Sequence, residues 1–463
     1  MAKMTPAAPH LPRFKGEIGI ARRDITPPVG IYSRNWGAAL DDVATGVHKP
    51  FFATAVVIRP EAGPTLILAA VDGSWWQSQE DEWRIRRAII EESEFDISQV
   101  MIAFSHSHAG PSLASCNRDR SGGEHIEPYL AMMSRAVAEA TSEALERLQP
   151  AIITWATGRS DLAVNRNLKD PEGERYLTGY NPGAAADDTL LVGRVTNVRG
   201  DPLGTLVNYA CHPTTLAWEN RLLSPDYVGA MRELVEAHTG NAPCAFLLGA
   251  CGELAPAHQY SGDVGVADSH GRRLGHSVCA TLEGLPGPEQ ELVFTGPVES
   301  GAPLAVWRPQ PLQLVASRTE ARYITIPLEI KPDFPTAAAI KRDREASRDR
   351  VIRERLARKL RIRELLGDAQ EYPFPVWIWK AGDTLFVGTP GEAYSDLQQA
   401  LRTAFPDLAV VVMNIVNGSI GYLPPDKLYD RDLYEVWQTP FQRGSYERLL
   451  EGCLDTIKGL ILR

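Results

Sequence analysis

The sequence predicts an α/β protein, a single large domain with mixed β-sheets packed together, helices outside and a metal site at the strand ends. The first observation is that short apolar runs alternate with longer helical patterns along most of the chain. The second is the composition of the 463 residues, 44% hydrophobic and 23% charged, which is typical of a globular protein and excludes a disordered one. A chain of this length can bury a large core.

The elements are predicted in chain order. Residues 1–16 are predicted to be a flexible tail, and residues 17–463 to form one domain. Ser224, followed by Pro225 and Asp226, is predicted to start a helix that stops at Gly240. Apolar and amphipathic runs predict strands at 56–60, 65–72 and 100–104, and helices at 79–92 and 126–148.

The segment at about 335–367 is predicted to be one long, charged, amphipathic helix. Its Arg and Lys residues alternate with Glu and Asp at the spacing of helical ion pairs, which favours a solvated face over a nucleic-acid site. Three further apolar runs, at 376–379, 384–387 and 410–415, predict strands.

Charge and cysteine content limit the possible partners and the compartment. The chain has 58 acidic and 48 basic residues, a net charge of −10, which argues against nucleic acid or an anionic membrane. Neither an apolar run of the roughly 18 residues that a membrane helix needs nor an N-terminal signal-peptide segment is recognisable. The six cysteines, with no CxxC pair, are typical of reduced thiols. We therefore expect a cytoplasmic protein.

Polar or ionisable side chains follow several of the predicted strands, each beside Gly or Pro. Strand ends that lead into tight loops are where α/β proteins bind ligands, so these side chains are predicted to share one site. They are His106, His108, His212, Glu253, Glu392 and Asn417.

The histidines and a glutamate in this set indicate a metal. His106 and His108 are two residues apart, so both would point to the same side of an extended backbone. Two imidazoles and one carboxylate are a frequent ligand set of catalytic zinc, and Glu392 is the best carboxylate for it. The alternative is that each histidine only caps its strand. Cys251, also at a strand end, is a weaker candidate nucleophile because buried free cysteines are far commoner than catalytic ones.

Five short motifs give the chain a resemblance to a known family. They are GIARRDITP at 19–27, SHSHAGP at 105–111, NRN at 165–167, ACHP at 210–213 and PGE at 390–392. In order and spacing they resemble the N-terminal catalytic domain of the neutral (non-lysosomal) ceramidase family, over roughly residues 17–460.

The resemblance implies roles for individual residues. It implies zinc on His106, His212, Glu392 and a tyrosine, Tyr422 in NGSIGY. It also implies that His108 and Arg166 grip the scissile carbonyl. The serine proposed as the family's nucleophile corresponds here to Ala255, in GELAP at 252–256, and the chain ends about where the family's catalytic domain ends.

We therefore expect a zinc-dependent hydrolase that cleaves an amide (or ester) bond of a small soluble substrate. Because Ala255 cannot attack, the expected nucleophile is water activated by the metal. His108 would act as general acid/base or carbonyl polariser and Arg166 would stabilise the oxyanion. Two alternatives stay open: a zinc lyase or isomerase acting on a sugar or polyol with Glu253 as base, and a metal-binding homologue without catalysis.

Overall fold

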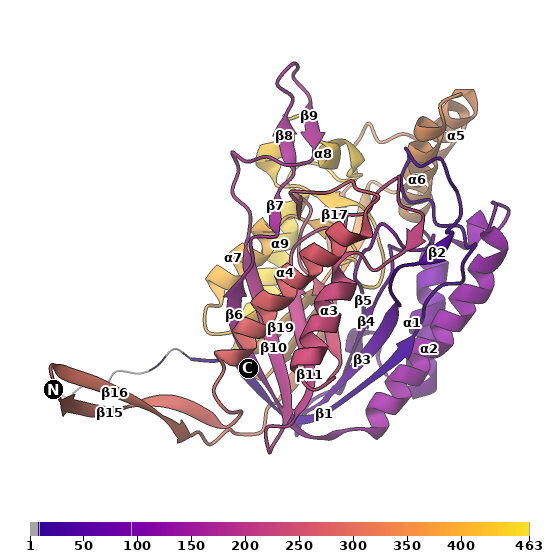
Figure 1. Ribbon diagram of the computed structural model, residues 1–463. Helices are drawn as coiled ribbons and strands as arrows, with labels where there is room; N and C mark the ends of the chain where they lie inside the picture. The colour runs from indigo at the N-terminus through magenta and orange to yellow at the C-terminus, as the bar shows by residue number, and fades with distance from the viewer. Residues whose placement is uncertain (1–7, 9, 94, 463) are drawn as a thin grey trace.

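Two β-sheets pack face to face, and helices cover the outer face of each (Figure 1). The computed structural model describes residues 8, 10–93 and 95–462. Both sheets are mixed, so the predicted fold class is confirmed. None of the helices in this part of the chain combines the length and apolar composition needed to cross a membrane.

The larger sheet has eight strands in the order β13-β11-β10-β6-β1-β3-β4-β5. Its edge pairs β4–β5 and β11–β13 are parallel and its central pairs are antiparallel. The sheet is strongly curved, because its two edge strands β13 and β5 come into contact. In chain order the strands are β1 (Arg13–Asp24), β3 (Phe52–Arg59), β4 (Leu66–Val71), β5 (Val100–Phe104), β6 (Gln149–Arg159), β10 (Thr189–Asn197), β11 (Pro202–Tyr209) and β13 (Cys244–Leu248).

The smaller sheet has four strands in the order β17-β18-β19-β21. They are β17 (Thr319–Glu329), β18 (Glu371–Ala381), β19 (Thr384–Gly388) and β21 (Ala409–Met413), of which β19 and β21 are parallel. Its inner face packs Trp377, Trp379 and Phe386 against Phe14 and Ile18 of the larger sheet, and these five side chains are at most 2% exposed. Burying aromatic groups of this size contributes much of the hydrophobic stabilisation of the interface between the sheets.

Helices cover the outside of both sheets. On the larger sheet these are α1 (Gln79–Ser93), α2 (Ile126–Glu146), α3 (Tyr227–His238) and α4 (Val264–Glu283). The remaining helices are α5 (Ala337–Ala346), α6 (Arg350–Leu366), α7 (Asp396–Ala404), α8 (Tyr434–Gln438) and α9 (Ser445–Ile461). The predicted start of α3 is confirmed, because the Asp226 carboxylate accepts a hydrogen bond from the Tyr227 amide.

The predicted single helix over about 335–367 is wrong, because the chain forms two helices there. Ser347 is extended and ends α5, and Asp349 caps α6 by accepting hydrogen bonds from the amides of Val351 and Ile352. A side chain that satisfies the free amides of a first turn favours a new helix start over continuation of the old one. Nor is α6 simply exposed, since it buries Leu360 and Leu366.

The predicted tail also ends earlier than expected. Residues 13–16 belong to β1, because Phe14 is buried between the two sheets and Arg13 pairs in register with Thr154. Residues 1–7 and 9 lie outside the described residues.

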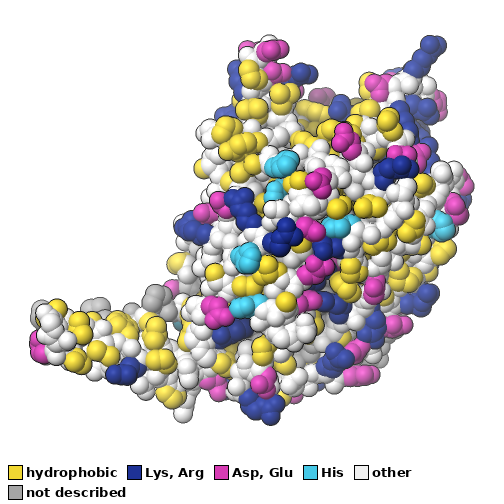
Figure 2. All heavy atoms as spheres, in the orientation of Figure 1, with side chains coloured by type: hydrophobic (Ala, Val, Ile, Leu, Met, Phe, Trp, Pro, Cys, Tyr) yellow, Lys and Arg dark blue, Asp and Glu magenta, His cyan; other side chains and the backbone are white. Residues whose placement is uncertain are grey.

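Short strands complete the fold. They are β2 (Gly46–Val47) with β12 (Leu222–Leu223), β7 (Ala163–Asn165) with β14 (Leu254–Pro256), β8 (Asn167–Lys169) with β9 (Tyr176–Thr178), and β20 (Glu392–Ala393) with β22 (Tyr422–Leu423). The hairpin of β15 (Gln290–Glu299) and β16 (Pro303–Pro311) extends away from the body of the protein (Figure 1). Hydrophobic side chains are visible along its surface (Figure 2).

Candidate active site

The loop after β21 joins the two edges of the curved sheet. The backbone amide of Asn414 donates to the carbonyl of Leu248, at the end of β13 (3.1 Å). Asn417 lies against β5, where its side-chain oxygen accepts from the Ile102 amide (2.8 Å) and its side-chain nitrogen donates to the Val100 carbonyl (2.9 Å). The loop therefore brings the ends of strands that are distant in sheet order to one place.

His106 adopts a conformation that differs from the predicted one. The backbone leaves the extended conformation after Phe104, and His106 has a φ of 65°, so the argument from an extended strand is wrong. A left-handed conformation costs a non-glycine residue on the order of 1–3 kcal/mol, which surrounding contacts must offset. One such contact is the hydrogen bond that the Ser107 amide donates to the Gly73 carbonyl (2.8 Å). The rings of His106 and His108 nevertheless lie close together, with centroids 4.9 Å apart.

His106 and His212 each direct one ring nitrogen at Glu392. Nδ1 of His106 donates to the Ser74 carbonyl (2.9 Å), and Nδ1 of His212 donates to the Cys251 carbonyl (2.7 Å). Their Nε2 atoms then face the same carboxylate oxygen of Glu392, at 3.6 and 2.9 Å. Hydrogen bonds from Nδ1 to backbone carbonyls are the usual way in which metal-ligating histidines are oriented.

The ring nitrogens of His106 and His212 that face Glu392 are suited to bind a cation. Burial and the charge of Arg166 lower the pKa of His212 to about 4, so its Nε2 carries a lone pair directed at a carboxylate. Nε2 of His106 is buried without a hydrogen-bond partner among the described residues. Two ring nitrogens and a carboxylate that converge in a buried site are a suitable place for a cation, and imidazole with carboxylate suits zinc.

His108 completes a cluster of three histidines. The candidate ligand atoms of His106, His108 and His212 all lie within 4.8 Å of one another. Burial of the His108 nitrogens, and then the charges of His106 and His212, hold the pKa of His108 well below its ordinary value. Its neutral ring, 5.0 Å from the Trp75 ring, could accept a proton or serve as a further ligand.

Tyr422 lies beside these groups. The parallel pair β20–β22 places it directly opposite Glu392, and its ring stacks on that of His212, with centroids 6.4 Å apart. Burial and the neighbouring Glu392 raise the pKa of the Tyr422 phenol well above its ordinary value. The structure therefore brings His106, His212, Glu392 and Tyr422 together, as the resemblance implied.

Arg166 reaches this cluster from behind Tyr422, with its guanidinium 5.5 Å from the centre of that ring. It forms an ion pair with Glu435 of α8, in which Nη2 and Nε lie 2.9 and 3.0 Å from Oε1. Arg166 is 4% exposed and Glu435 is fully buried. Sequence reasoning missed Glu435, because it is 269 residues from its partner and carries no motif of its own.

The two remaining polar candidates, Glu253 and Cys251, are buried away from the histidine cluster's cavity. The Glu253 carboxylate accepts hydrogen bonds from the amide and hydroxyl of Ser395, and burial raises its pKa to about 7. Glu253 does not line the pocket described below, where the lyase or isomerase alternative would need it as a base. Burial also raises the pKa of the Cys251 thiol well above its ordinary value, so it is not a thiolate. Ala255 is fully buried in β14, opposite Val164.

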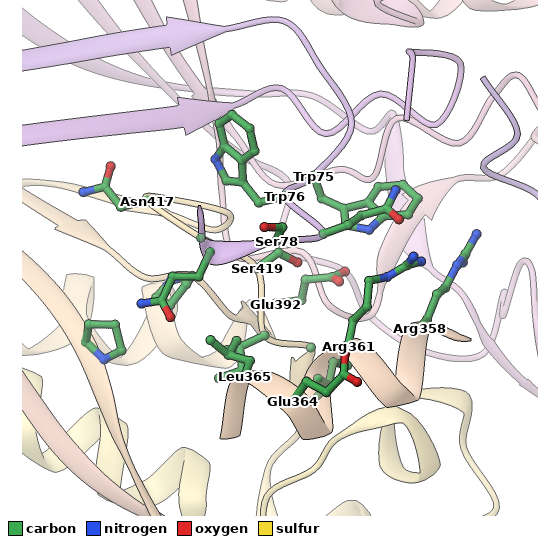
Figure 3. Close-up of a pocket in the computed structure, with 18 of the residues that line it drawn as sticks. Trp75, Trp76, Ser78, Arg358, Arg361, Glu364, Leu365, Glu392, Asn417 and Ser419 are labelled. Atoms are coloured by element: carbon green, nitrogen blue, oxygen red, sulfur yellow. The ribbon is translucent and has the colours of Figure 1, made fainter. Parts of the chain in front are cut away.

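A cavity of about 570 Å³ opens over the histidines. One wall carries His106, His108, Glu392 and Tyr422, and α6 forms another wall. Figure 3 shows Glu392 and Ser419 facing the cavity, with Trp75 above them and Arg358 and Arg361 extending from α6. This volume suits a small organic molecule.

The comparisons with known proteins agree with these motifs. A family profile described as neutral/alkaline non-lysosomal ceramidase, N-terminal, matches residues 17–253, just over half of the chain. Neutral ceramidases of Drosophila pseudoobscura and Pseudomonas aeruginosa are each 26% identical to it, over 48% and 46% of this chain. Each match spans about a third (32%) of the relative's length.

Solved structures match more of the chain. A structure described as ceramidase complexed with C2 superposes with a TM-score of 0.67 at 16% identity, and it covers 96% of this chain and 74% of that one. The neutral ceramidase of Pseudomonas aeruginosa superposes with a TM-score of 0.65 at 18% identity, over 95% and 73% of the two chains. These similarities show the same fold. With the profile match, they establish that the chain belongs to the neutral/alkaline non-lysosomal ceramidase family.

Proposed function

We propose that the protein is a zinc-dependent hydrolase that cleaves an amide bond of a small molecule. The observation that carries this proposal is the convergence of the Nε2 atoms of His106 and His212 on Glu392, with both Nδ1 atoms already bonded to backbone carbonyls. The names of the relatives, neutral ceramidases, point to the same class of bond.

Each residue of the site has a proposed role in this reaction. His106, His212 and Glu392 would hold the metal, and Tyr422 is the fourth candidate ligand. When bound, zinc supplies a Lewis acid and makes water a nucleophile near neutral pH. The neutral ring of His108 would take up a proton from the attacking water and give it to the departing amine as the amide C–N bond breaks. Arg166 does not line the cavity, so in place of the oxyanion contact expected from the sequence it would act from behind Tyr422, where it faces that ring and adds positive charge.

Water is the proposed nucleophile because the two positions considered for a nucleophile from the sequence, Ala255 and Cys251, are unsuited to attack. Ala255 has no nucleophilic group and Cys251 is a buried thiol. Ser78, Ser115 and Ser419 line the cavity, but none of them has a hydrogen bond to a histidine in the described structure, and the Ser115 hydroxyl donates to Asp81. A serine without such a base is a weak nucleophile.

Hydrolysis accounts for the site better than a lyase or isomerase reaction does. The base considered for those reactions, Glu253, is hydrogen-bonded to Ser395 and does not line the cavity. For the substrate, the cavity of about 570 Å³ and its charged α6 wall favour a smaller and more polar amide than ceramide.

Metal analysis and an amide screen test the proposal. Purified protein is expected to carry close to one zinc per chain and to release amine from at least one member of a panel of N-acyl compounds. His106→Ala and His212→Ala should each empty the site and abolish turnover. His238→Ala, a surface histidine paired with Glu283, is the matched control and should keep both. Full zinc occupancy in a His106→Ala, His212→Ala double variant would contradict the assignment.

A further inference from the structure

We infer that Arg358 and Arg361 form a binding site for an anionic group of the substrate, so that the enzyme prefers amides that carry a carboxylate, such as N-acyl amino acids. This inference rests on the proposed function and names its substrate class. The observation is the presence of two guanidinium groups, without carboxylate partners, in the wall of the cavity that faces the histidine cluster.

Both arginines lie on the inner side of α6. They are three residues apart, and residues at this spacing share one face of a helix. Both line the cavity and are half-buried. Figure 3 shows their side chains extending from α6 toward the loop that carries Trp75.

Neither guanidinium has a compensating negative charge. Within the described residues no carboxylate lies within 4.0 Å of Arg358 or Arg361, whereas Arg350 on the same helix pairs with Asp42. Arg358 donates to the Asn35 carbonyl (2.6 Å), and the contact of Arg361 is the Cys116 sulfur at 3.7 Å, a weak acceptor. Burial lowers the pKa of the Arg361 guanidinium, as expected where charge is poorly compensated.

The other charged side chains of the cavity wall do not neutralise these two. Arg86 is paired with Glu82 (2.7 Å), and Glu364 with Lys341 (3.2 Å). Glu80 is exposed at the start of α1, and Glu392 belongs to the histidine cluster. The α6 wall therefore presents a net positive charge to the cavity interior.

The position of this charge suits a substrate that spans the cavity. The Arg358 guanidinium lies 5.3 Å from the centre of the Trp75 ring, and that ring lies 5.0 Å from His108. One aromatic ring thus separates the arginine from the proposed proton-transfer group. A carboxylate held by planar guanidinium groups would place a nearby amide bond over the histidines.

Binding of a matched pair of probes tests the inference. The probes are N-benzoylglycine and its neutral analogue N-benzoylglycinamide, titrated calorimetrically into the protein as purified. The wild-type protein should bind the carboxylate at least tenfold more tightly than the carboxamide. Arg358→Gln and Arg361→Gln should each weaken carboxylate binding roughly 10- to 100-fold and leave carboxamide binding unchanged. A carboxylate that bound the metal instead would not respond to these changes.

Control variants separate charge from packing. Arg355→Gln removes an exposed arginine of the same helix that packs on Trp437 outside the cavity, and it should change neither affinity. Arg358→Lys keeps the charge and should retain part of the preference. Melting temperatures of all variants identify any loss of fold.

The outcomes distinguish this inference from the proposed function. A wild-type protein without preference for the carboxylate, or a preference unchanged in Arg361→Gln, overturns the anion site. Benzoate release from both probes and from the N-acyl panel is measured in parallel. Absence of all amide turnover with the carboxylate preference intact would overturn hydrolysis and leave the anion site standing.

Discussion

Glu392 and Tyr422 lie directly opposite each other in the two-residue parallel pair β20–β22, although they are separated by the whole of α7 and β21. This pairing places a carboxylate and a phenol side by side, next to His212. The stacking of Tyr422 on the His212 ring and the 2.9 Å approach of Glu392 to His212 Nε2 follow from that arrangement.

The first prediction concerns Tyr422. If its hydroxyl is a metal ligand, Tyr422→Phe should bind zinc at least tenfold more weakly while the ring still packs against His212. Tyr434→Phe is the matched control, because Tyr434 packs against Tyr422 with ring centroids 5.5 Å apart and is not a candidate ligand. Zinc affinity can be measured by competition with a chelator. Equal affinity in the two variants would remove Tyr422 from the ligand set.

The second prediction separates two roles of His108. If His108 is a proton-transfer group, His108→Gln should retain close to one zinc per chain while the catalytic constant falls roughly 100- to 10,000-fold. If His108 is instead a metal ligand, the same variant should lose both the metal and the activity. Zinc content by elemental analysis, together with steady-state kinetics, distinguishes the two roles, and we expect the first.

The third prediction concerns the ion pair of Arg166 and Glu435. Glu435→Ala would leave the buried guanidinium without its partner, which is expected to cost on the order of 3–5 kcal/mol of unfolding free energy. Replacing both residues, in Arg166→Met with Glu435→Leu, should recover much of that loss, because no unpaired charge remains. Urea unfolding measures both values. A loss below about 1 kcal/mol in the single variant would show that the pair is not needed for stability.

The fourth prediction is a pH dependence of stability at Glu253. Its pKa is about 7 in the folded protein against 4.5 in its ordinary state, so the folded state binds this proton more tightly than the unfolded state does. The stability that this group contributes is therefore fully present below about pH 4.5 and is lost as the pH rises from there through about 7. The loss is about 3 kcal/mol.

Glu253→Gln should remove this dependence. The unfolding free energy of the variant, taken relative to that of the wild type, should increase from pH 5 to pH 8, because the amide has no proton to lose. Urea unfolding of both proteins at pH 5 and pH 8 measures this difference. Other titrating groups, such as Asp226, contribute equally to both proteins and therefore cancel. A difference that does not change with pH would show that Glu253 ionises normally.

The sequence by itself determined the local elements and most of the chemistry-bearing residues. Continuous apolar runs such as 100–104 and 384–387 are strands because both of their faces are buried, and this information lies within a few residues. The motifs around His106, His212 and Glu392 were recognisable for the same reason. The helix break at Asp349 was also local, and capping chemistry at that residue outweighed the amphipathic pattern around it.

The tertiary structure alone decided which of these residues meet. The approach of His106 to His212 depends on the curvature of the larger sheet and on the loop through Asn417, which bonds to β5 across 315 residues. The pairing of Arg166 with Glu435 and the direction of Arg358 and Arg361 likewise depend on how α8 and α6 pack. Propensity and periodicity act over one or two turns of chain, whereas proximity in a site is set by the packing of the whole core.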